Sequence, residues 1–202
     1  MNASPDSVPP PIHLLLVDDD RLVLTTLSAD LRHAGYQVST AESVADAEGL
    51  LFGGRRPDLV ILDVRMPDGG GLSLARRLGE LDHLPFVMLS AYSDSETVQS
   101  ATALGALGYL VKPVDAQQIV PTIEAALKRA GDLRQLSTRT QQLQQALDGE
   151  RDIGVAVGVT MAQHRLSRQA ALDVLRQSAR SQRRRLADLA KEMIHAVELL
   201  SG

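Results

Sequence analysis

The stretch that decides the fold is Pro57-Asp58-Leu59-Val60-Ile61-Leu62-Asp63-Val64-Arg65-Met66-Pro67. Its apolar residues are consecutive, lack helical spacing and lie between two prolines, which predicts a strand buried on both faces of a parallel sheet. The strand ends on a carboxylate, Asp63. Because open parallel sheets place their ligand sites at the carboxyl ends of central strands, we expect Asp63 to belong to a functional site.

Short apolar segments alternate with amphipathic segments on both sides of this strand, which is typical of a doubly wound parallel sheet. Gly35 follows the first amphipathic segment where a left-handed cap is needed, and Ser43 and Asp115 are placed to cap later helices. We predict an α/β domain with strands at 12–17, 36–39, 57–63, 86–89 and 108–111, helices at 21–33, 43–52, 72–81, 95–104 and beyond 115, and a glycine loop at 69–71.

With 202 residues, the chain is long enough for one full domain and a smaller appendage. It lacks cysteine, which excludes a disulfide framework, thiolate metal sites and thiol catalysis. No segment approaches the roughly 18 apolar residues of a membrane span. The polar, proline-rich start at 1–11 has no signal-peptide core, so we expect a disordered arm on a cytoplasmic protein that has no membrane partner.

The formal net charge of −4 is unevenly distributed. Residues 1–114 contain 8 basic and 15 acidic side chains, residues 115–149 contain 4 and 4, and residues 150–202 contain 9 and 6. The acidic N-terminal part, 1–114, and the basic tail, 150–202, indicate that a polyanion would bind the tail, while the N-terminal part would bind cations or phosphoryl groups. Ordinary surface charge is the alternative interpretation.

Carboxylates follow two of the predicted strands directly. The acidic triplet 18–20 comes after the first strand, and Asp63 ends the central one, so we expect two or three carboxylates to converge at one edge of the sheet. Their like charges require a cation, and oxygen ligands without His or Cys favour Mg²⁺ over zinc. Ser90 and Lys112, at the ends of later strands, add the hydroxyl and the positive charge that a phosphorylated carboxylate requires.

Four motifs resemble the receiver domain of two-component response regulators, in order and in spacing: Val17-Asp18-Asp19, Asp63 with Met66-Pro67, Leu89-Ser90-Ala91, and Tyr109-Leu110-Val111-Lys112-Pro113. The resemblance covers about residues 12–130. It implies a flavodoxin-like fold with strand order 2-1-3-4-5 and a cis peptide bond before Pro113. It also implies a regulator phosphorylated by a sensor histidine kinase. Such a regulator is not an enzyme beyond Mg²⁺-dependent self-phosphorylation from a donor and slow autodephosphorylation.

The resemblance also assigns roles at the acidic site. Asp63 would be the phosphoacceptor. Asp19 and Asp63 would bind Mg²⁺ directly, Asp18 would bind it through water, and the backbone carbonyl of Arg65 would be a further ligand.

Three more residues would act on the phosphoryl group. Lys112 would hold its oxygens, Ser90 would hydrogen-bond to it, and Tyr109 would turn inward behind Ser90 as the second member of the switch pair. The side chains of Arg65 and Tyr92 would shield the acyl phosphate from water, or would point to solvent without effect.

Beyond this domain, apolar residues continue at intervals of three and four along one long helix. The intervals match a heptad seam with one slip in phase, which predicts a coiled coil between two copies of the chain. Pro121 should kink the helix, and Gly131 should weaken it. A surface helix with a glutamine-rich linker is the alternative. The predicted seam consists of Ile119, Ile123, Ala126, Ala130, Leu133, Leu136, Thr140, Leu143 and Leu147.

The segment 153–159 begins the tail and has the local propensity of a strand. A continued helix would instead place Gly154, Gly158 and Ala162 on one face, where another helix could approach closely, and we favour this interpretation. Two further helices are predicted, one capped by Ser167 and one over 186–197. The tail is therefore expected to be a small three-helix unit.

This tail resembles the ANTAR output domain, which is named for antitermination regulators that bind RNA. The resemblance covers about residues 150–196. The family usually has Gln and Lys near Val155 and Val157 and an aromatic residue near Leu172, so this sequence lacks one basic contact and one packing aromatic. The residues that support the resemblance are Ile153, Ala156, Gly158, Met161, Leu166, Ser167, Ala171, Leu175, Arg176, Ala179, Leu186, Ala187, Asp188 and Ala190.

We expect phosphorylation to control binding of RNA hairpins and thereby to cause transcription antitermination. A helical dimerisation or protein-docking module that has lost RNA binding is the alternative. A DNA-binding helix-turn-helix is disfavoured, because the tail lacks a recognition helix with a polar reading face. The expected domains are a disordered arm at 1–11, a receiver at 12–130, a coiled-coil linker at 131–149 and an all-helical output domain at 150–202.

Phosphate contacts and stacked guanidinium groups would have to carry RNA binding, because no aromatic residue lies beyond Tyr109. The densest basic run, 183–185, is expected at the start of a helix. The candidate contacts are Arg180, Arg183, Arg184, Arg185, Arg151 and Arg176, followed by Arg165 and Arg168.

Overall fold

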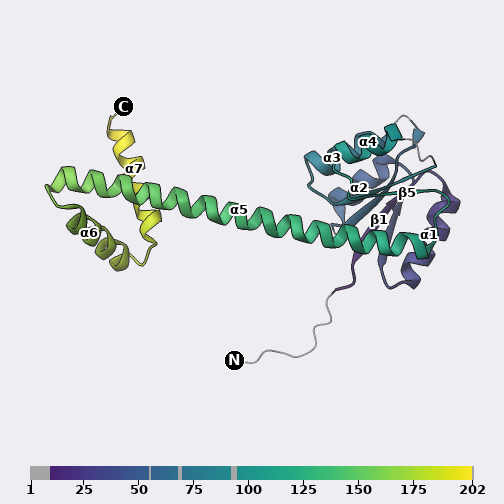
Figure 1. The fold of residues 1–202 in the computed structure, drawn as a ribbon, viewed down its shortest axis with the longest axis horizontal. Coiled ribbons are helices and arrows are strands. Elements are labelled where there is room, and N and C mark those ends of the chain that lie inside the picture. Colours follow the sequence, from purple (N-terminus) through teal and green to yellow (C-terminus); the bar gives the residue numbers. More distant parts are fainter. Residues whose placement is uncertain (1–9, 55, 68–69, 92–94, 202) are drawn as a thin grey trace, which may run out of the picture. The chain divides into compact units, whose positions relative to one another are not determined.

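The computed structural model describes residues 10–54, 56–67, 70–91 and 95–201 (Figure 1). The chain divides into two compact units, Met1–Leu133 and Arg134–Gly202, which we call the α/β unit and the helical unit. Most of the predicted arm lies outside the described residues, as do Gly69, Tyr92 and Asp94.

Five parallel strands form one sheet in the order β2-β1-β3-β4-β5, which confirms the predicted fold. The central strand, β3, pairs with β1 through Leu14 opposite Leu59 and with β4 through Val60 opposite Phe86. Every residue of β3 and β4 is buried, as their unbroken apolar runs predicted. The strands are His13–Val17 (β1), Gln37–Ala41 (β2), Leu59–Asp63 (β3), Phe86–Ser90 (β4) and Gly108–Val111 (β5).

Helices cover both faces of the sheet, and successive strand residues point to opposite faces. Along β1, for example, Leu14 and Leu16 pack in a core with α1 and α5, whereas Leu15 and Val17 pack in a core with α2, α3 and α4. These two cores fix the carboxyl ends of the strands, where the candidate site lies. The helices of this unit are Arg21–His33 (α1), Val44–Gly53 (α2), Gly70–Glu80 (α3), Ser95–Ala103 (α4) and the first part of Ala116–His164 (α5).

The predicted helix caps are present. The Ser43 hydroxyl accepts a hydrogen bond from the Asp46 amide at 3.1 Å, and Asp115 accepts one from the Gln118 amide at 3.0 Å. Gly35 has a left-handed backbone with φ of 95° at the end of α1, where the sequence required one. The Lys112-Pro113 peptide bond is cis, as the resemblance implied.

Helix α5 runs without interruption from Ala116 to His164, through both Pro121 and Gly131. Its first turns use Ile119 and Ile123 to pack on the sheet, where both side chains are fully buried. These two isoleucines therefore do not belong to an intermolecular seam, and this part of the predicted seam is wrong. The slip in phase marks the point where the stripe that packs inside the α/β unit gives way to a second, exposed stripe.

The second stripe lies on a part of α5 that has no internal packing. Every residue from 131 to 148 is exposed, including Leu133, Leu136, Leu143 and Leu147. Within the described part of the chain, no helix is both long and apolar enough to cross a membrane.

The helical unit contains the last part of α5 together with α6 (Arg168–Ser181) and α7 (Leu186–Ser201). Its core is built from aliphatic and methionine side chains without an aromatic ring, and at its centre lie Ala156, Val157, Ala171, Leu175 and Ala190. The segment 153–159 is helical, as predicted.

The helix-packing face of this segment differs from the expected one. Gly154 and Gly158 are exposed, and a Cβ atom at either position would meet nothing within 4 Å among the described residues. The α5 residues that pack in the helical unit are instead Ile153, Ala156 and Val157. The predicted close approach of a helix to the glycine face is therefore wrong within this chain.

Candidate functional site

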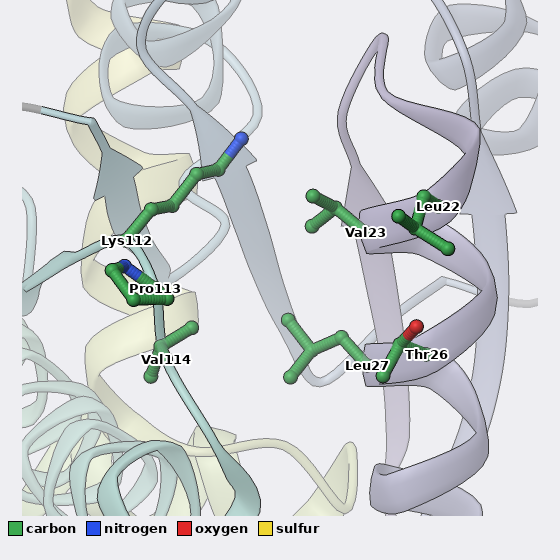
Figure 2. A pocket seen from close by; sticks show the side chains of 7 residues that line it. All are labelled: Leu22, Val23, Thr26, Leu27, Lys112, Pro113 and Val114. Carbon is green, nitrogen blue, oxygen red and sulfur yellow. The ribbon is translucent and has the colours of Figure 1, made fainter.

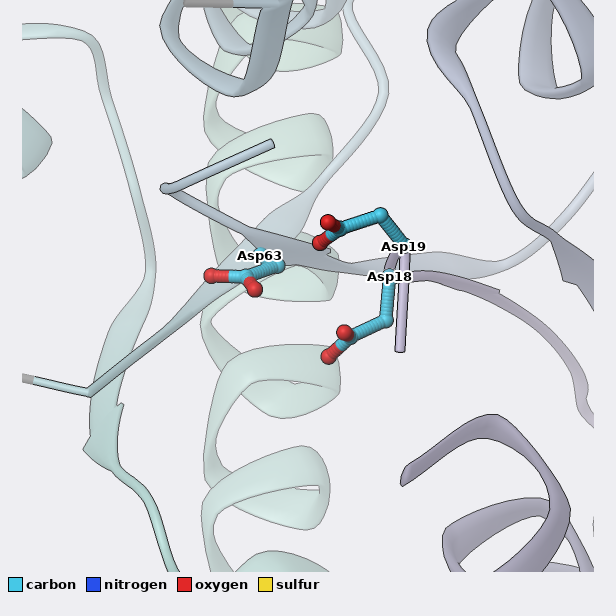
Figure 3. A group of neighbouring side chains, drawn as sticks. All are labelled: Asp18, Asp19 and Asp63. Carbon is cyan, nitrogen blue, oxygen red and sulfur yellow. The ribbon is translucent and has the colours of Figure 1, made fainter. Parts of the chain in front are cut away.

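Three carboxylates converge where β1 and β3 end, as the sequence predicted. Asp18 and Asp19 directly follow β1, and Asp63 is the last residue of β3. One oxygen from each lies within 4.8 Å of the others (Figure 3). Asp18 and Asp63 are buried and Asp19 is exposed, so the cluster opens to solvent on the Asp19 side.

Lys112, which follows β5, reaches two of these carboxylates. Its Nζ atom lies 2.6 Å from Asp18 Oδ2 and 2.7 Å from Asp63 Oδ2. The contact with Asp63 is a charge-assisted hydrogen bond, whereas the contact with Asp18 is an ion pair that lacks hydrogen-bond geometry. One ammonium therefore serves two buried carboxylates, which leaves the three-carboxylate cluster with excess negative charge.

The pKa values of these groups reflect burial and charge together. Burial raises the pKa of Asp18 above its usual value, and the neighbouring Lys112 and the Asp20 amide only partly oppose this effect. Burial by itself would lower the pKa of Lys112, but its close contacts with the negatively charged Asp18 and Asp63 outweigh this effect, and the net pKa is raised. Lys112 therefore stays charged through the physiological range.

Both oxygens of Asp63 are engaged, so its orientation is fixed. The backbone amide of Arg65 donates to Oδ1 at 3.0 Å, and Lys112 donates to Oδ2 at 2.7 Å. The strand holds the backbone in place, because Asp63 pairs with Leu89 and the Val64 amide donates to the Leu89 carbonyl at 2.9 Å. Asp63 is thus positioned by two strands and two polar contacts.

The third acid of the triplet has a structural task that the sequence analysis missed. Asp20 accepts hydrogen bonds from the amides of Leu22 and Val23 and caps the start of α1. The Asp20 amide in turn donates to Asp18 Oδ1 at 3.0 Å, so the cap also orients Asp18. The position of Asp20 immediately before a predicted helix was the signal that could have shown this role.

The donor set fits a hard divalent cation. Asp18, Asp19 and Asp63 offer only carboxylate oxygens, and their excess negative charge favours a cation beside them. Mg²⁺ prefers such ligands and is commonly held by one or two carboxylates together with water. The carbonyl of Arg65 remains a predicted ligand.

The two predicted switch residues lie on β4 and β5. Ser90 is the fully buried last residue of β4, and its carbonyl accepts a hydrogen bond from the Lys112 amide at 2.7 Å. Tyr109 pairs with Met88 and is partly buried against the core that contains α4. Ser90 thus lies at the carboxyl end of its strand, whereas Tyr109 is the second residue of β5. The switching role of both residues remains a prediction.

A pocket beside the acidic site was not identified from the sequence. It has a volume of about 380 Å³ and lies between α1 and the segment that follows β5 (Figure 2). Lys112 borders both this pocket and the acidic site. The other lining residues are Leu22, Val23, Thr26, Leu27, Pro113 and Val114.

The arginines proposed for RNA binding are all exposed in the helical unit, but two of them are ion-paired. Arg184 pairs with Glu192, and Arg176 lies 3.6 Å from Asp173. The run 183–185 forms the connection between α6 and α7, so only its last residue borders a helix start, and the expected placement at a helix start is wrong for the rest. Arg180 lies in the last turn of α6 and Arg151 lies on α5.

Comparison with known families divides the chain as its architecture does. The response regulator receiver domain matches residues 14–124, and the ANTAR domain matches residues 141–194.

Three relatives illustrate the extent of the similarity. The transcriptional regulatory protein PdtaR of Mycobacterium tuberculosis is 27% identical over 187 residues, which cover 93% of this chain and 91% of PdtaR. The transcriptional regulatory protein AfsQ1 of Streptomyces coelicolor is 39% identical over 57% of this chain and 51% of its own length. The crystal structure of the chemotaxis protein CheY4 of Vibrio cholerae, at 30% identity, covers 57% of this chain and 98% of its own with a TM-score of 0.53.

Proposed function

Since the chain belongs to the response regulator receiver family and carries a C-terminal ANTAR domain, we propose that phosphorylation of Asp63 controls RNA binding by the helical unit and thereby transcription antitermination. The observation that carries the proposal is the convergence of Asp18, Asp19, Asp63 and Lys112 at the carboxyl edge of the sheet. Such regulators are not enzymes in the ordinary sense, and the site serves as an acceptor of phosphate.

The chemistry at Asp63 is a phosphoryl transfer from a phosphohistidine of a sensor kinase. A carboxylate oxygen of Asp63 forms a bond to phosphorus as the nitrogen–phosphorus bond breaks, and the histidine nitrogen keeps the bonding electron pair. Lys112, 2.7 Å from Asp63 Oδ2, neutralises charge on the phosphoryl oxygens. When bound, Mg²⁺ supplies further positive charge that offsets repulsion between the carboxylates and the incoming phosphate.

The same contacts suggest how phosphorylation changes the α/β unit. A phosphoryl group on Asp63 competes with Asp18 and Asp63 for the single ammonium of Lys112. The hydroxyl of Ser90, at the end of the neighbouring strand, is the second group that we assign to the phosphoryl oxygens. Tyr109, two strands from Asp63, follows Ser90 inward in this proposal.

The exposed leucines of α5 support a homodimer. Leu133, Leu136, Leu143 and Leu147 are 56–67% exposed, and with Thr140 they follow the three-and-four spacing of a coiled coil. A helical stretch without tertiary packing gains little stability from local propensity. Pairing with the same stretch of a second copy would bury each leucine, which contributes about 1.5–3 kcal/mol of transfer free energy per side chain before entropy costs.

RNA is the partner that we assign to the basic helical unit, which carries 9 basic and 6 acidic residues from 150 onward. Most of its arginines are exposed, and a folded RNA offers phosphates to match them. We further propose that the protein acts in the cytoplasm, where both a kinase and a nascent transcript are accessible.

One observation favours the alternative of a docking module. Val155 is 46% exposed on α5, near a position where the family usually has a polar or basic residue. An exposed apolar residue there suits a protein partner better than a phosphate. Val157, by contrast, is buried in the core of the helical unit, so its departure from the pattern removes no surface contact.

RNA crosslinking in cells tests the proposal directly. Wild-type protein should recover a defined set of transcripts with hairpins, and Asp63→Asn should change the recovered amount. Binding assays with hairpin RNA and duplex DNA across salt concentrations provide the control for non-specific charge attraction. If a dimeric and phosphorylated protein recovers no RNA above background, the RNA-binding function would be rejected in favour of the docking module.

A further inference from the structure

Five described residues have a left-handed backbone, and the two in the helical unit are both arginines. Gly35 and Gly105 have φ of 95° and 85°, and glycine adopts this conformation without steric cost. His83, Arg165 and Arg183 have φ of 48°, 53° and 53°, a conformation that a side chain with a Cβ atom disfavours.

The histidine has a side-chain interaction that offsets this cost, whereas the side chains of the two arginines have none with the described residues. His83 Nδ1 lies within hydrogen-bond distance of the Gly79 carbonyl, 3.1 Å away in the preceding turn. Within the described parts of the chain, neither Arg165 nor Arg183 has a side-chain hydrogen bond or ion pair. Both side chains are exposed, so they are also not held by packing.

Both arginines occupy a position at a helix end that suits glycine. The Arg183 amide donates to the Arg180 carbonyl at 3.1 Å, and the next amide, that of Arg184, donates to the Ala179 carbonyl at 2.9 Å. The same pair of bonds closes α1 at Gly35. At the end of α5, the Leu166 amide that follows Arg165 donates to the Met161 carbonyl at 3.2 Å. This is the helix-ending motif that glycine normally completes.

The backbone bonds of this motif would form equally well with glycine, so an arginine kept in this disfavoured conformation points to a role of its side chain. We propose that Arg165 and Arg183 are the principal phosphate contacts of the RNA site, an inference that rests on the RNA-binding function proposed above. They are preferred over Arg184 and Arg176, whose guanidinium groups are already paired with Glu192 and Asp173. An unpaired guanidinium meets a phosphate without first breaking an ion pair.

The two arginines flank α6, which connects to α5 at one end and to α7 at the other (Figure 1). The 14 residues of α6 span about 21 Å at 1.5 Å per residue. An RNA that contacts both arginines therefore extends along the whole of α6. The contacts should act independently, so their effects on binding free energy should add.

Substitution by glycine separates the charge from the backbone conformation. Arg165→Gly and Arg183→Gly remove the guanidinium and suit the left-handed backbone, so the thermal midpoint of the full-length protein should stay unchanged or rise. Each should reduce the slope of log affinity against log salt by about 0.7–0.9, for a hairpin selected from a randomised RNA pool on wild-type protein. The double variant should lose about twice that slope. Arg184→Ala, which removes the same charge from the same connection, is the matched control and should change the slope less.

Three results would overturn the assignment. The first is hairpin binding with wild-type affinity and salt slope by both glycine variants. The second is a lower thermal midpoint in both variants, because the arginines would then be retained to stabilise the negative ends of the preceding helices. The third is a wild-type protein that enriches no RNA, which would overturn the RNA-binding function as well.

Discussion

Lys112 Nζ lies 2.7 Å from Asp63 Oδ2 and connects the last strand of the sheet with its central strand. The same ammonium is 2.6 Å from Asp18, so a single cation holds two buried carboxylates that would otherwise repel each other. Any group added to Asp63 must change this arrangement. The chemistry of the site and the stability of the unit are therefore coupled through one side chain.

Asp63→Asn should abolish phosphorylation by a small phosphodonor in the presence of Mg²⁺, because the amide cannot form an acyl phosphate. Intact-mass measurement of the protein after incubation with the donor checks this. Asp20→Asn is the matched control: Asp20 caps α1 and Asn caps a helix equally well, so this variant should still accept phosphate. Undiminished phosphate on Asp63→Asn would contradict the assignment of the acceptor.

Asp18→Asn should stabilise the metal-free protein relative to wild type by an amount that grows as pH rises above 3.8. Burial raises the pKa of Asp18 above the unfolded value of 3.8, so the folded state holds the proton more tightly. The contribution of Asp18 to stability is therefore present below pH 3.8 and is lost as pH rises through its folded pKa. Urea unfolding of both proteins in a chelator measures the difference.

When Mg²⁺ is present, the stability difference should reverse, and Asp18→Asn should be less stable than wild type. A cation that binds only the folded state, at a free concentration 100 times its dissociation constant, adds about 2.7 kcal/mol to the free energy of unfolding. Asp18→Asn should lose part of this added stability. Equal Mg²⁺-induced stabilisation of wild type and variant would exclude Asp18 from the cation site.

Gly71→Ala should destabilise the α/β unit by about 1–3 kcal/mol, because α3 starts in close contact with the end of β3. A Cβ atom at this position would overlap the backbone carbonyl oxygens of Asp63 and Val64. Gly131→Ala is the contrasting control. Among the residues that the structure describes, nothing lies within 4 Å of its Cβ position, and Ala should stabilise the exposed helix by about 0.5–1 kcal/mol. Chemical denaturation of both variants provides the measurement.

Leu136→Asp combined with Leu143→Asp should convert a dimer to a monomer, because charges would enter the seam of the coiled coil. The two leucines are 63% and 67% exposed in the single chain, so the substitutions should leave the fold intact. Thr138→Asp with Gln145→Asp adds the same charges at the same spacing outside the seam, and this variant should remain dimeric. Analytical sedimentation of the two double variants measures their oligomeric state. If both remain dimers, the dimer interface does not lie on this stripe of leucines.

The fold of the α/β unit could be predicted from the sequence because its signals agree. The buried runs at β3 and β4, the helix caps at Ser43 and Asp115, and the left-handed Gly35 all indicated the same elements. The acidic cluster could be predicted as well, because parallel strands bring their carboxyl ends to one edge.

The errors arose where one helix presents different faces to different partners. Periodicity alone cannot distinguish an apolar stripe that packs on the sheet of its own chain from one that could pair with a second chain. For this reason Ile119 and Leu136 were assigned to one seam. The exposed faces at Gly154 and Gly158 show the same ambiguity. The left-handed Arg165 and Arg183 gave no signal, because arginine normally indicates neither a turn nor a cap.

Because the helical unit contains no Phe, Tyr or Trp, it contributes no aromatic absorption or fluorescence in the near-ultraviolet. All five aromatic residues of the chain, Tyr36, Phe52, Phe86, Tyr92 and Tyr109, belong to the α/β unit, and tryptophan is absent. Tyrosine fluorescence therefore reports melting of the α/β unit alone, whereas circular dichroism of the peptide bond registers both units. The difference between the two melting curves isolates the helical unit optically, without a label and without cutting the chain.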